Sequence, residues 1–310
     1  FFGKYRVEAV IGKGGMGLVY EGEDTVLNRH VAIKFLPETL TQNPKAIERF
    51  ITEAQVAGRL NHPNVIAIYD IGQEADHFYI VMELLNPLSA AGYVKERGPM
   101  HWAEATKVIA DCCSALHAAH QVGLIHRDIK PPNILIAKGP FGPVAKIGDF
   151  GIAKAERYWE TRTGQTPATH GYMSPEQIKT PDEIDHRSDI FSLGCTLYEL
   201  ATLRQAFEGK TVYDVQQAAV NGRYIPPERR GADPMIAVII HRALRVSRTD
   251  RYQSCDELLR DLEAVRASLA GSRGGTSGMG KVLLAAGAGL IGGLGFLTGY
   301  GVHEWSASGG

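Results

Sequence analysis

The feature that most restricts the fold of this chain is a glycine-rich turn between two strand-like stretches. Residues 5–11 alternate loosely between apolar and polar side chains, residues 12–17 read Gly-Lys-Gly-Gly-Met-Gly, and a strand pattern resumes at residues 18–22. Because glycine has no side chain, the backbone of such a turn can approach a phosphate closely and present its N–H groups. A dinucleotide-binding G-x-G-x-x-G opens a helix, whereas this one joins two strands. The pattern therefore favours a hairpin that covers nucleotide phosphates.

A second stretch, residues 125–133, places a carboxylate, a cation and an amide close together in the sequence. Asp128 offers a proton acceptor, Lys130 a charge that can neutralise a transferring group, and Asn133 an amide oxygen for a metal ion. By spacing alone, an aspartate and a lysine two residues apart are more commonly a solvated turn. The chemical interpretation therefore depends on the motifs that accompany this stretch.

Composition limits the classes of function. The 310 residues, 44% of them hydrophobic, predict one large domain with a core and an appendage. A net charge of -1 provides no basic field for a nucleic-acid backbone, so a polynucleotide partner is not expected. The four cysteines do not have metal-binding spacing and are too few for a disulfide scaffold, which fits a reducing, cytoplasmic setting. No charged segment leading into an apolar run follows Phe1, so a signal peptide is not predicted.

The remaining motifs match, in order, the signature set of protein kinases. After the glycine-rich turn come Val31-Ala32-Ile33-Lys34, the stretch His126 to Asn133, Asp149-Phe150-Gly151 and Ser174-Pro175-Glu176. From about Tyr5 to about Leu269, the chain resembles the eukaryotic-like (Hanks-type) Ser/Thr protein kinases, most closely the bacterial receptor-type branch.

The resemblance implies an α+β, two-lobed kinase domain over residues 1–269. A small lobe, about 1–82, would contain a five-stranded antiparallel sheet and one helix, and a mainly helical large lobe would span about 86–269. Apolar patterns predict helices at 45–60, 102–121, 185–200 and 254–269, and strands at 65–69, 78–82 and 134–136. His117 and His120 lie on the second of these helices, where solvated or hydrogen-bonded histidine is favoured over a metal site.

The same resemblance implies an ATP site between the lobes. A lysine that ends an apolar strand is commonly a surface residue, but Glu53 stands beside the apolar stripe of the next helix, where the family pairs a glutamate with Lys34. Pro87, Ala90 and Gly92 depart from the residues that relatives often carry at the ribose end. The implied ATP-binding residues are Ile11, Gly12, Lys13, Gly14, Gly15, Met16, Gly17, Leu18, Val19, Ala32, Lys34, Glu53, Met82, Glu83, Leu85 and Leu135.

For catalysis, the resemblance assigns Asp128 and Lys130, with Asn133 and Asp149 as ligands for Mg²⁺, or alternatively Mn²⁺. Thr169 matches a threonine that positions the substrate in Ser/Thr-specific members, which predicts proteins with Ser or Thr acceptors as substrates.

Three threonines of the activation segment, Thr161, Thr163 and Thr166, are candidates for autophosphorylation. A phosphate there would pair with Arg127 and order the segment. Two contacts implied by the family are structural: Asp189 would tether the catalytic loop, and Arg251 would pair with Glu176.

Composition changes sharply at Ala270. Residues 270–281 predict a flexible Gly/Ser-rich linker, and residues 282–302 contain no charge and are long enough for a single transmembrane helix. Positive charges precede this span, so the kinase domain is expected in the cytoplasm at the cell membrane, with 303–310 beginning an extracytoplasmic segment. The alternative is a buried apolar helix. A small-residue stripe of Ala288, Gly292, Gly295 and Gly299 predicts a homodimer formed through the membrane helix.

Three functional classes compete. An active protein kinase keeps five residues that a pseudokinase scaffold typically loses in part, and all five are present here: Lys34, Glu53, Asp128, Asn133 and Asp149. A small-molecule phosphotransferase fits less well, because the long activation segment suits peptide substrates. The sequence thus predicts a membrane-anchored, ATP-dependent Ser/Thr protein kinase, with a pseudokinase scaffold as the alternative.

Overall fold

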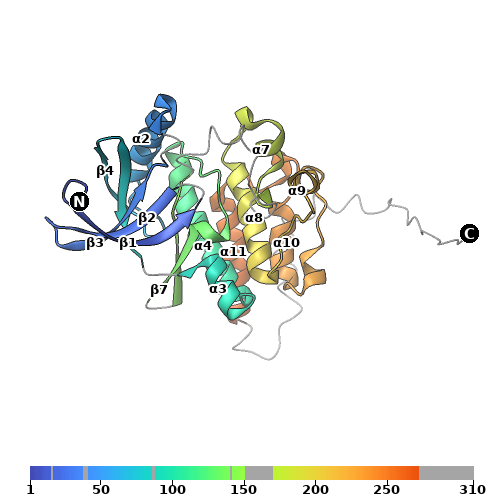
Figure 1. The fold of residues 1–310 in the computed structure, drawn as a ribbon. Helices are drawn as coiled ribbons and strands as arrows, with labels where there is room; N and C mark the ends of the chain where they lie inside the picture. The colour runs from blue at the N-terminus through green and yellow to red at the C-terminus, as the bar shows by residue number, and fades with distance from the viewer. Residues whose placement is uncertain (15–16, 38–40, 86–87, 140–141, 151–169, 272–310) are drawn as a thin grey trace, which may run out of the picture. The chain divides into compact units, whose positions relative to one another are not determined.

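The computed structural model describes residues 1–14, 17–37, 41–85, 88–139, 142–150 and 170–271. Residues Phe1–Val265 form one unit, which contains a small lobe of strands and a larger, mainly helical lobe (Figure 1). The two lobes predicted from the sequence are therefore present. The described residues contain no helix that is both long and apolar enough to cross a membrane. The predicted membrane span, 282–302, and residues 303–310 lie outside the described residues.

The small lobe is a five-stranded antiparallel sheet with one helix, as predicted. Its strands lie in the order β1-β2-β3-β5-β4. The elements are β1 (Tyr5–Gly14), β2 (Gly17–Asp24), β3 (Arg29–Phe35), α2 (Pro44–Gly58), β4 (Ile68–Glu74) and β5 (His77–Glu83). On α2, the buried residues Phe50, Ala54 and Ala57 belong to the predicted apolar stripe and pack into the main core.

The strand predicted at 65–69 begins later, at Ile68. Val65 forms a parallel bridge with Ile147 of the large lobe, and the Ile66 N–H donates to the Ile147 carbonyl at 2.9 Å. Apolar side chains suit a connecting segment packed between two sheets as well as they suit a strand, so the pattern alone placed the start of the strand wrongly.

Strand register places four predicted nucleotide-binding side chains on one face of the small-lobe sheet. Val19 lies directly opposite Lys34 in the β2–β3 ladder, and Met82 lies directly opposite Ala32 in the β3–β5 ladder. Ala32 and Lys34 are two residues apart on β3 and therefore point the same way. Residues directly opposite each other share a face, so all four side chains lie on the same side of the sheet.

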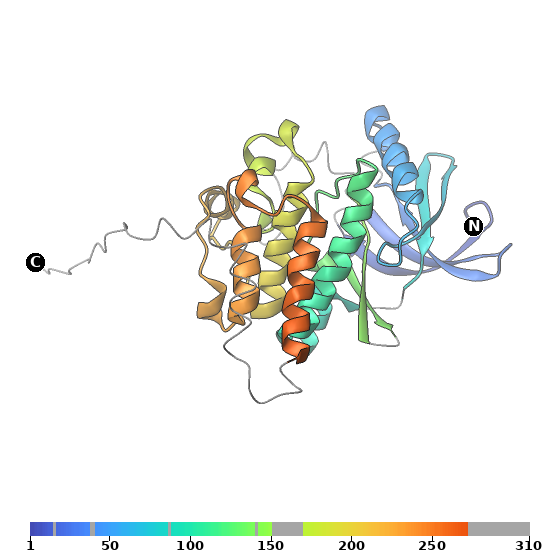
Figure 2. The same ribbon diagram turned by 180° about the vertical axis from the view of Figure 1, so that it is seen from behind.

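The large lobe combines a three-stranded sheet with a group of helices (Figure 2). Helix α8 is buried on almost every side, as an apolar helix at the centre of a lobe must be, and α4 packs against both α8 and β8. The elements are β6 (Leu88–Ser89), α3 (Ala90–Arg97), α4 (Trp102–Gln121), η1 (Pro131–Asn133), β7 (Ile134–Gly139), β8 (Gly142–Ile147), α7 (Pro175–Lys179), η2 (Pro181–Glu183), α8 (Arg187–Thr202), α9 (Val212–Val220), η3 (Pro227–Arg230), α10 (Pro234–Ala243), η4 (Arg248–Asp250) and α11 (Cys255–Gly271).

Some of these elements were not predicted, although their sequences carry start signals. Helix α9 begins at a capping box in which Thr211 and Asp214 exchange side-chain and backbone hydrogen bonds. Helix α10 follows an Asp233 N-cap and has proline at its first position. Helix α11 extends to Gly271, two residues beyond the predicted end of the domain and into the predicted linker. The four cysteines, all within the described residues, are free thiols, in line with the absence of a disulfide pattern.

Candidate active site

The segment between α4 and η1 carries Asp128, and the buried carboxylate of Asp189 binds its backbone. This carboxylate, at the start of α8, accepts the backbone N–H of His126 at 2.9 Å and that of Arg127 at 2.8 Å. It also contacts Nε2 of His120, from α4, at 2.8 Å. Burial alone would raise the pKa of Asp189, but the hydrogen bond and charge of His120 lower it below its usual range. The carboxylate therefore stays ionised and anchors the loop, the role that the sequence predicted.

His120 is hydrogen-bonded and not solvated. Burial opposes its protonation, but the Asp189 hydrogen bond and a contact with Cys255 raise its pKa to about 10. Its Nδ1 lies 3.8 Å from the Cys255 sulfur. A cationic imidazole thus compensates the Asp189 charge beneath the catalytic loop.

His126 connects the two halves of the site and was not singled out from the sequence. Its ring is fully buried, and burial lowers its pKa, so the imidazole is neutral. Nδ1 accepts the Asp128 backbone N–H at 3.2 Å, which leaves the proton on Nε2, 3.0 Å from the Gly148 carbonyl. Gly148 precedes Asp149, so the neutral His126 ring links the backbone segments that carry the two candidate carboxylates, Asp128 and Asp149.

Asp128, Lys130 and Asn133 lie in contact with one another, although spacing alone favoured a solvated turn. The Asn133 amide nitrogen donates to the Asp128 carboxylate at 2.9 Å and to its backbone carbonyl at 2.8 Å. Lys130 Nζ lies 3.1 Å from the same carboxylate. Because the amide nitrogen faces Asp128, the Asn133 amide oxygen is directed away from it and can serve a cation. The arrangement fixes the orientation of a carboxylate that is only 9% exposed.

Lys34 and Asp149 join the two lobes. Lys34 Nζ, on β3, donates to Asp149 Oδ1 at 2.5 Å, and the lysine side chain is 7% exposed. Burial by itself would raise the pKa of Asp149, but the Lys34 charge and hydrogen bond lower it below its usual range. Gly148 N–H donates to the Asn133 carbonyl at 3.2 Å, which brings Asn133 and Asp149 onto neighbouring backbone segments. An ionised carboxylate and an amide oxygen suit a hard divalent cation.

Two residues of the site have backbone conformations that are uncommon for non-glycine residues. Arg127 has φ 64° and Asp149 has φ 56°. Such conformations cost free energy and persist only where surrounding contacts impose them. For Arg127 these contacts include the Asp189 carboxylate on its N–H and the Gln177 amide on its carbonyl at 2.9 Å. Gln177 was not predicted, although Ser174 and Gln177 form a capping box whose sequence signature is recognisable.

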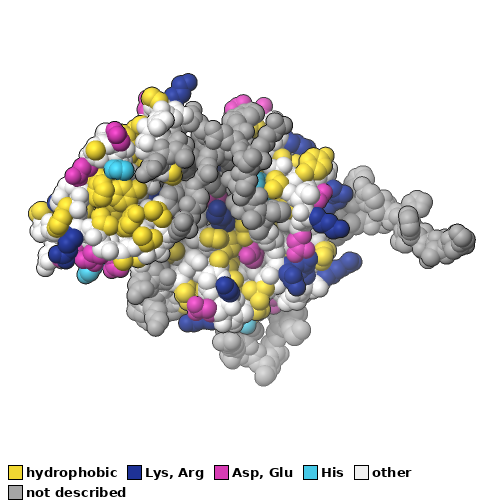
Figure 3. All heavy atoms as spheres, viewed as in Figure 1, with side chains coloured by type: hydrophobic (Ala, Val, Ile, Leu, Met, Phe, Trp, Pro, Cys, Tyr) yellow, Lys and Arg dark blue, Asp and Glu magenta, His cyan; other side chains and the backbone are white. Residues whose placement is uncertain are grey.

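The predicted ATP-binding residues divide into those whose positions are described and those that are not. Ile11 and Gly12 lie near the end of β1, Leu18 and Val19 lie near the start of β2, and Leu135 lies on β7 of the other lobe. Figure 3 shows apolar side chains gathered over the small-lobe strands. The Ile11 side chain is 47% exposed. Gly15 and Met16 lie outside the described residues, as do the side chains of Lys13 and Glu53, so the predicted Lys34–Glu53 ion pair remains a prediction.

The residues predicted to position the substrate and to carry phosphate also lie outside the described part of the chain. Thr161, Thr163, Thr166 and Thr169 lie within residues 151–169, outside the described residues. Just after them, the predicted ion pair between Glu176 and Arg251 is present and buried, with Oε1 and Oε2 at 2.6 and 2.7 Å from the guanidinium. It holds α7 against the large lobe.

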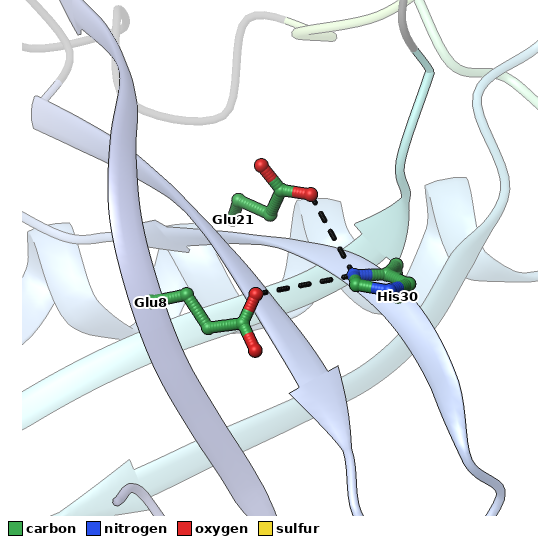
Figure 4. Close-up of side chains that lie close together, drawn as sticks. All are labelled: Glu8, Glu21 and His30. Carbon is green, nitrogen blue, oxygen red and sulfur yellow. Dashed lines mark ion pairs between the residues drawn. The ribbon is translucent and has the colours of Figure 1, made fainter.

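A different group of potential metal ligands lies on the small-lobe sheet. Figure 4 shows Glu8, Glu21 and His30 converging from β1, β2 and β3. His30 Nδ1 is 3.6 Å from Glu21 and 4.0 Å from Glu8, and Arg6 also lies 3.3 Å from Glu8. Contacts of these carboxylates with Arg6 and the His30 imidazole account for this cluster, and exposed pairs of this kind contribute little to stability.

Comparison with known proteins agrees with the geometry. The protein kinase domain model matches residues 5–261, and the chain belongs to the protein kinase family. It is 39% identical over 268 residues to the serine/threonine-protein kinase PknB of Mycolicibacterium smegmatis, covering 84% of this chain and 42% of that protein. It is 38% identical over 260 residues to PknE of Mycobacterium bovis, covering 83% of this chain and 45% of the relative. The chain thus spans less than half the length of these relatives.

Solved structures give the same fold. The kinase domain of Mycobacterium tuberculosis PknI is similar with a TM-score of 0.69 and 23% sequence identity, over 86% of this chain and 97% of that domain. At this identity the likeness concerns the fold alone.

Proposed function

We propose that this chain is an ATP-dependent protein kinase that transfers the γ-phosphoryl group to Ser or Thr hydroxyls of proteins. The proposal rests on the contacts of two carboxylates. Asp128 contacts Lys130 and Asn133, and Asp149 contacts Lys34 of the small lobe. Membership of the protein kinase family supports it, as do relatives that are named serine/threonine-protein kinases.

The proposed nucleotide site uses the face of the sheet that carries Val19, Ala32, Lys34 and Met82. Apolar side chains on this face would cover an adenine ring, and Leu135 on β7 would lie beneath it. A pocket of this kind is lined mainly by apolar groups, with a few polar groups that set orientation. Lys34, at the far end of the same face, would meet the phosphates.

The residues fit a divalent cation. Mg²⁺ prefers oxygen ligands and usually takes few of them from the protein, leaving the rest to water and phosphate. Asn133 would offer its amide oxygen and Asp149 a carboxylate that Lys34 keeps ionised. When bound, the ion would neutralise charge on the phosphates. Mn²⁺, with similar ligand preferences, would fit the same residues.

In the proposed reaction, the substrate hydroxyl oxygen forms a bond to the γ-phosphorus while the bond to the ADP oxygen breaks in line with it. The Asp128 carboxylate can orient the hydroxyl because Asn133 holds it in place. The same carboxylate accepts the hydroxyl proton. Lys130, 3.1 Å from that carboxylate, stabilises the charge that develops on the transferring group. Lys34 holds the nucleotide phosphates against the small lobe.

A first test compares Lys34→Met with the wild-type protein. The substitution removes the phosphate contact and the ion-pair partner of Asp149, so ATP turnover on a generic protein substrate is expected to fall at least about 100-fold. Lys95→Met, on the exposed side of α3, is the control and is expected to behave like the wild type. A wild-type protein that binds ATP without any turnover would indicate the pseudokinase scaffold instead.

Membrane anchoring is a further part of the proposal. Residues 282–302 would span the bilayer with the kinase domain in the cytoplasm, and the stripe that includes Gly292 and Gly295 would pair two copies. Replacing both glycines with leucine is expected to keep insertion and weaken self-association. The measurement is a membrane self-association assay, and an unchanged dimer signal with normal insertion would refute pairing.

The proposed autophosphorylation sites are Thr161 and Thr163, with Thr166 in reserve. A phosphate at either of the first two would engage Arg127. Mass spectrometry of active protein is expected to find phosphate at one or both. Full activity in a Thr161→Ala, Thr163→Ala double variant would contradict a role in activation.

A further inference from the structure

A salt bridge joins the small lobe to the large lobe at the end of β5. Lys146, on β8 of the large lobe, places its Nζ 2.8 Å from each carboxylate oxygen of Glu83, the last residue of β5 in the small lobe. The two side chains are 19% and 22% exposed. The family resemblance implies that residues 83–85 form the hinge, whose backbone would hydrogen-bond the adenine edge. Neither the Glu83 carboxylate nor Lys146 was given a role.

The Glu83 carboxylate is fixed on the small-lobe side. Its Oε2 accepts the Ala67 N–H at 3.3 Å, and the Glu83 N–H donates to the Ala67 carbonyl at 2.9 Å. Backbone and side chain of Glu83 are therefore bound to the same residue. A shift of the hinge backbone would have to break the contact with Lys146 or the contacts with Ala67.

Lys146 is fixed equally well on the large-lobe side. It lies opposite Leu135 in the β7–β8 ladder, so its backbone is paired with the residue proposed to lie beneath the adenine. The next residue, Ile147, donates to the Asn64 carbonyl at 2.8 Å and accepts from Ile66 at 2.9 Å. Three residues after Lys146 comes Asp149, the partner of Lys34. The lysine thus belongs to a short rigid segment between the adenine end and the phosphate end of the cleft.

We infer that the Lys146–Glu83 ion pair sets the separation between the hinge and the floor of the nucleotide site, and that Lys146 is a positioning residue for ATP. This inference rests on the proposed binding of ATP in this cleft. Lys146 is not assigned a contact with the nucleotide. It acts by holding Glu83, whose backbone borders the adenine, at a fixed distance from Leu135.

The strength of the contact suggests the size of the effect. Both hydrogen bonds are charge-assisted, and both partners are mostly buried, so the pair exceeds an ordinary surface salt bridge. Loss of the pair should weaken nucleotide binding about three- to tenfold. In the proposed function the chemical step depends on Asp128 and Lys130, so its rate should change much less.

The experiment compares Lys146→Met and Glu83→Gln, using calorimetry for the dissociation constant of ATP and steady-state kinetics for KM and kcat. Both variants are expected to raise the dissociation constant and the KM for ATP about three- to tenfold, with kcat within about twofold of the wild type. The two variants separate positioning from simple attraction. If only the local electrostatic field mattered, removing the negative charge of Glu83 would strengthen binding of the anionic nucleotide. If the Lys146–Glu83 ion pair positions the hinge, its loss weakens binding.

Lys107→Met is the matched control, because Lys107 also grips a carboxylate with two contacts of 2.6 Å, to Asp111, but within α4 of a single lobe. It is expected to leave ATP affinity unchanged.

Two results would overturn the inference: ATP affinity unchanged in Lys146→Met, or tighter binding in Glu83→Gln. Weaker binding in Lys107→Met equal to that in Lys146→Met would also overturn it. A wild-type protein that does not bind ATP would instead refute the proposed function, so the two failures are distinguishable.

Discussion

Replacing Asp128 with asparagine is expected to lower kcat about 10²- to 10⁴-fold, the usual contribution of a positioned general base. The change removes the proton acceptor but keeps an oxygen that can accept a hydrogen bond from the Asn133 amide nitrogen, which lies 2.9 Å from the Asp128 carboxylate. The loop should therefore keep its shape, and KM for ATP should change little. The measurement is phosphate transfer to a protein substrate at saturating ATP.

The matched control for this experiment is Asp182→Asn, an exposed aspartate in η2. It makes the same chemical change away from the site and is expected to keep full activity. A folded Asp128→Asn protein with kcat within twofold of the wild type would rule out Asp128 as the base. An equal loss in the control would mean that the assay reports stability and not chemistry.

The largest effect on stability is expected from Arg251→Met. Arg251 is 1% exposed, and besides its two contacts with Glu176 it donates to the backbone carbonyls of Arg245, Val246 and Arg187. Removing the guanidinium leaves the buried Glu176 carboxylate without its charge partner. Breaking a buried pair in this way costs about 3–5 kcal/mol of unfolding free energy. A urea titration followed by circular dichroism measures the loss.

Lowering the pH should reduce the difference in unfolding free energy between Arg251→Met and the wild type. Burial alone would raise the pKa of Glu176, but Arg251 lowers it below its usual range. A carboxylate with a lowered folded-state pKa contributes stability that is present above its unfolded pKa and lost as pH falls through the folded-state value. In the variant, Arg251 no longer opposes the effect of burial on the pKa of Glu176. Protonation of Glu176 therefore relieves the cost of burying its charge. The difference in unfolding free energy should therefore narrow as the pH falls through the range around 4.5, the ordinary pKa of glutamate, from the raised pKa of the variant to the lowered pKa of the wild type.

Arg260→Met provides the control, since Arg260 pairs with Asp256 on the surface of α11, where the side chains are 69% and 51% exposed. Its loss is expected to change the unfolding free energy by less than about 1 kcal/mol. Glu176→Gln combined with Arg251→Met should be more stable than Arg251→Met alone, because a neutral amide is cheaper to bury than an unpaired carboxylate. If the double variant is no more stable, the ion pair does not explain the loss.

The sequence predicted most of what is local. Asp128, Lys130 and Asn133 lie within six consecutive residues, so a loop that exposes one of them to the site brings the others with it. The amphipathic patterns of α2 and α4 gave their positions within about two residues, because helix periodicity requires only near neighbours. The two-lobed architecture was implied by the resemblance to protein kinases and not by these local patterns.

Contacts between distant residues were predicted only where family resemblance supplied them. Arg251 and Glu176 are 75 positions apart, and their pairing came from resemblance and not from any pattern in this chain. Lys146 and Glu83, 63 positions apart, have no periodic relation, so their salt bridge was missed. The late start of β4 has the same cause, since the backbone partner of Ile66 is the distant Ile147. A one-dimensional pattern records which side chains are apolar, but not which partner satisfies each backbone group.

The buried Asp189 carboxylate also determines how the catalytic loop can move. The amide protons of His126 and Arg127 are donated to a carboxylate on α8, the most deeply buried helix of the large lobe. These protons can exchange with solvent only when α8 separates from the loop, which requires cooperative opening of the lobe and not local fraying. Hydrogen exchange at these two amides should therefore be as slow as in the centre of α8, although both lie in a segment without helix or strand. The order of the loop is in this respect a property of the whole lobe.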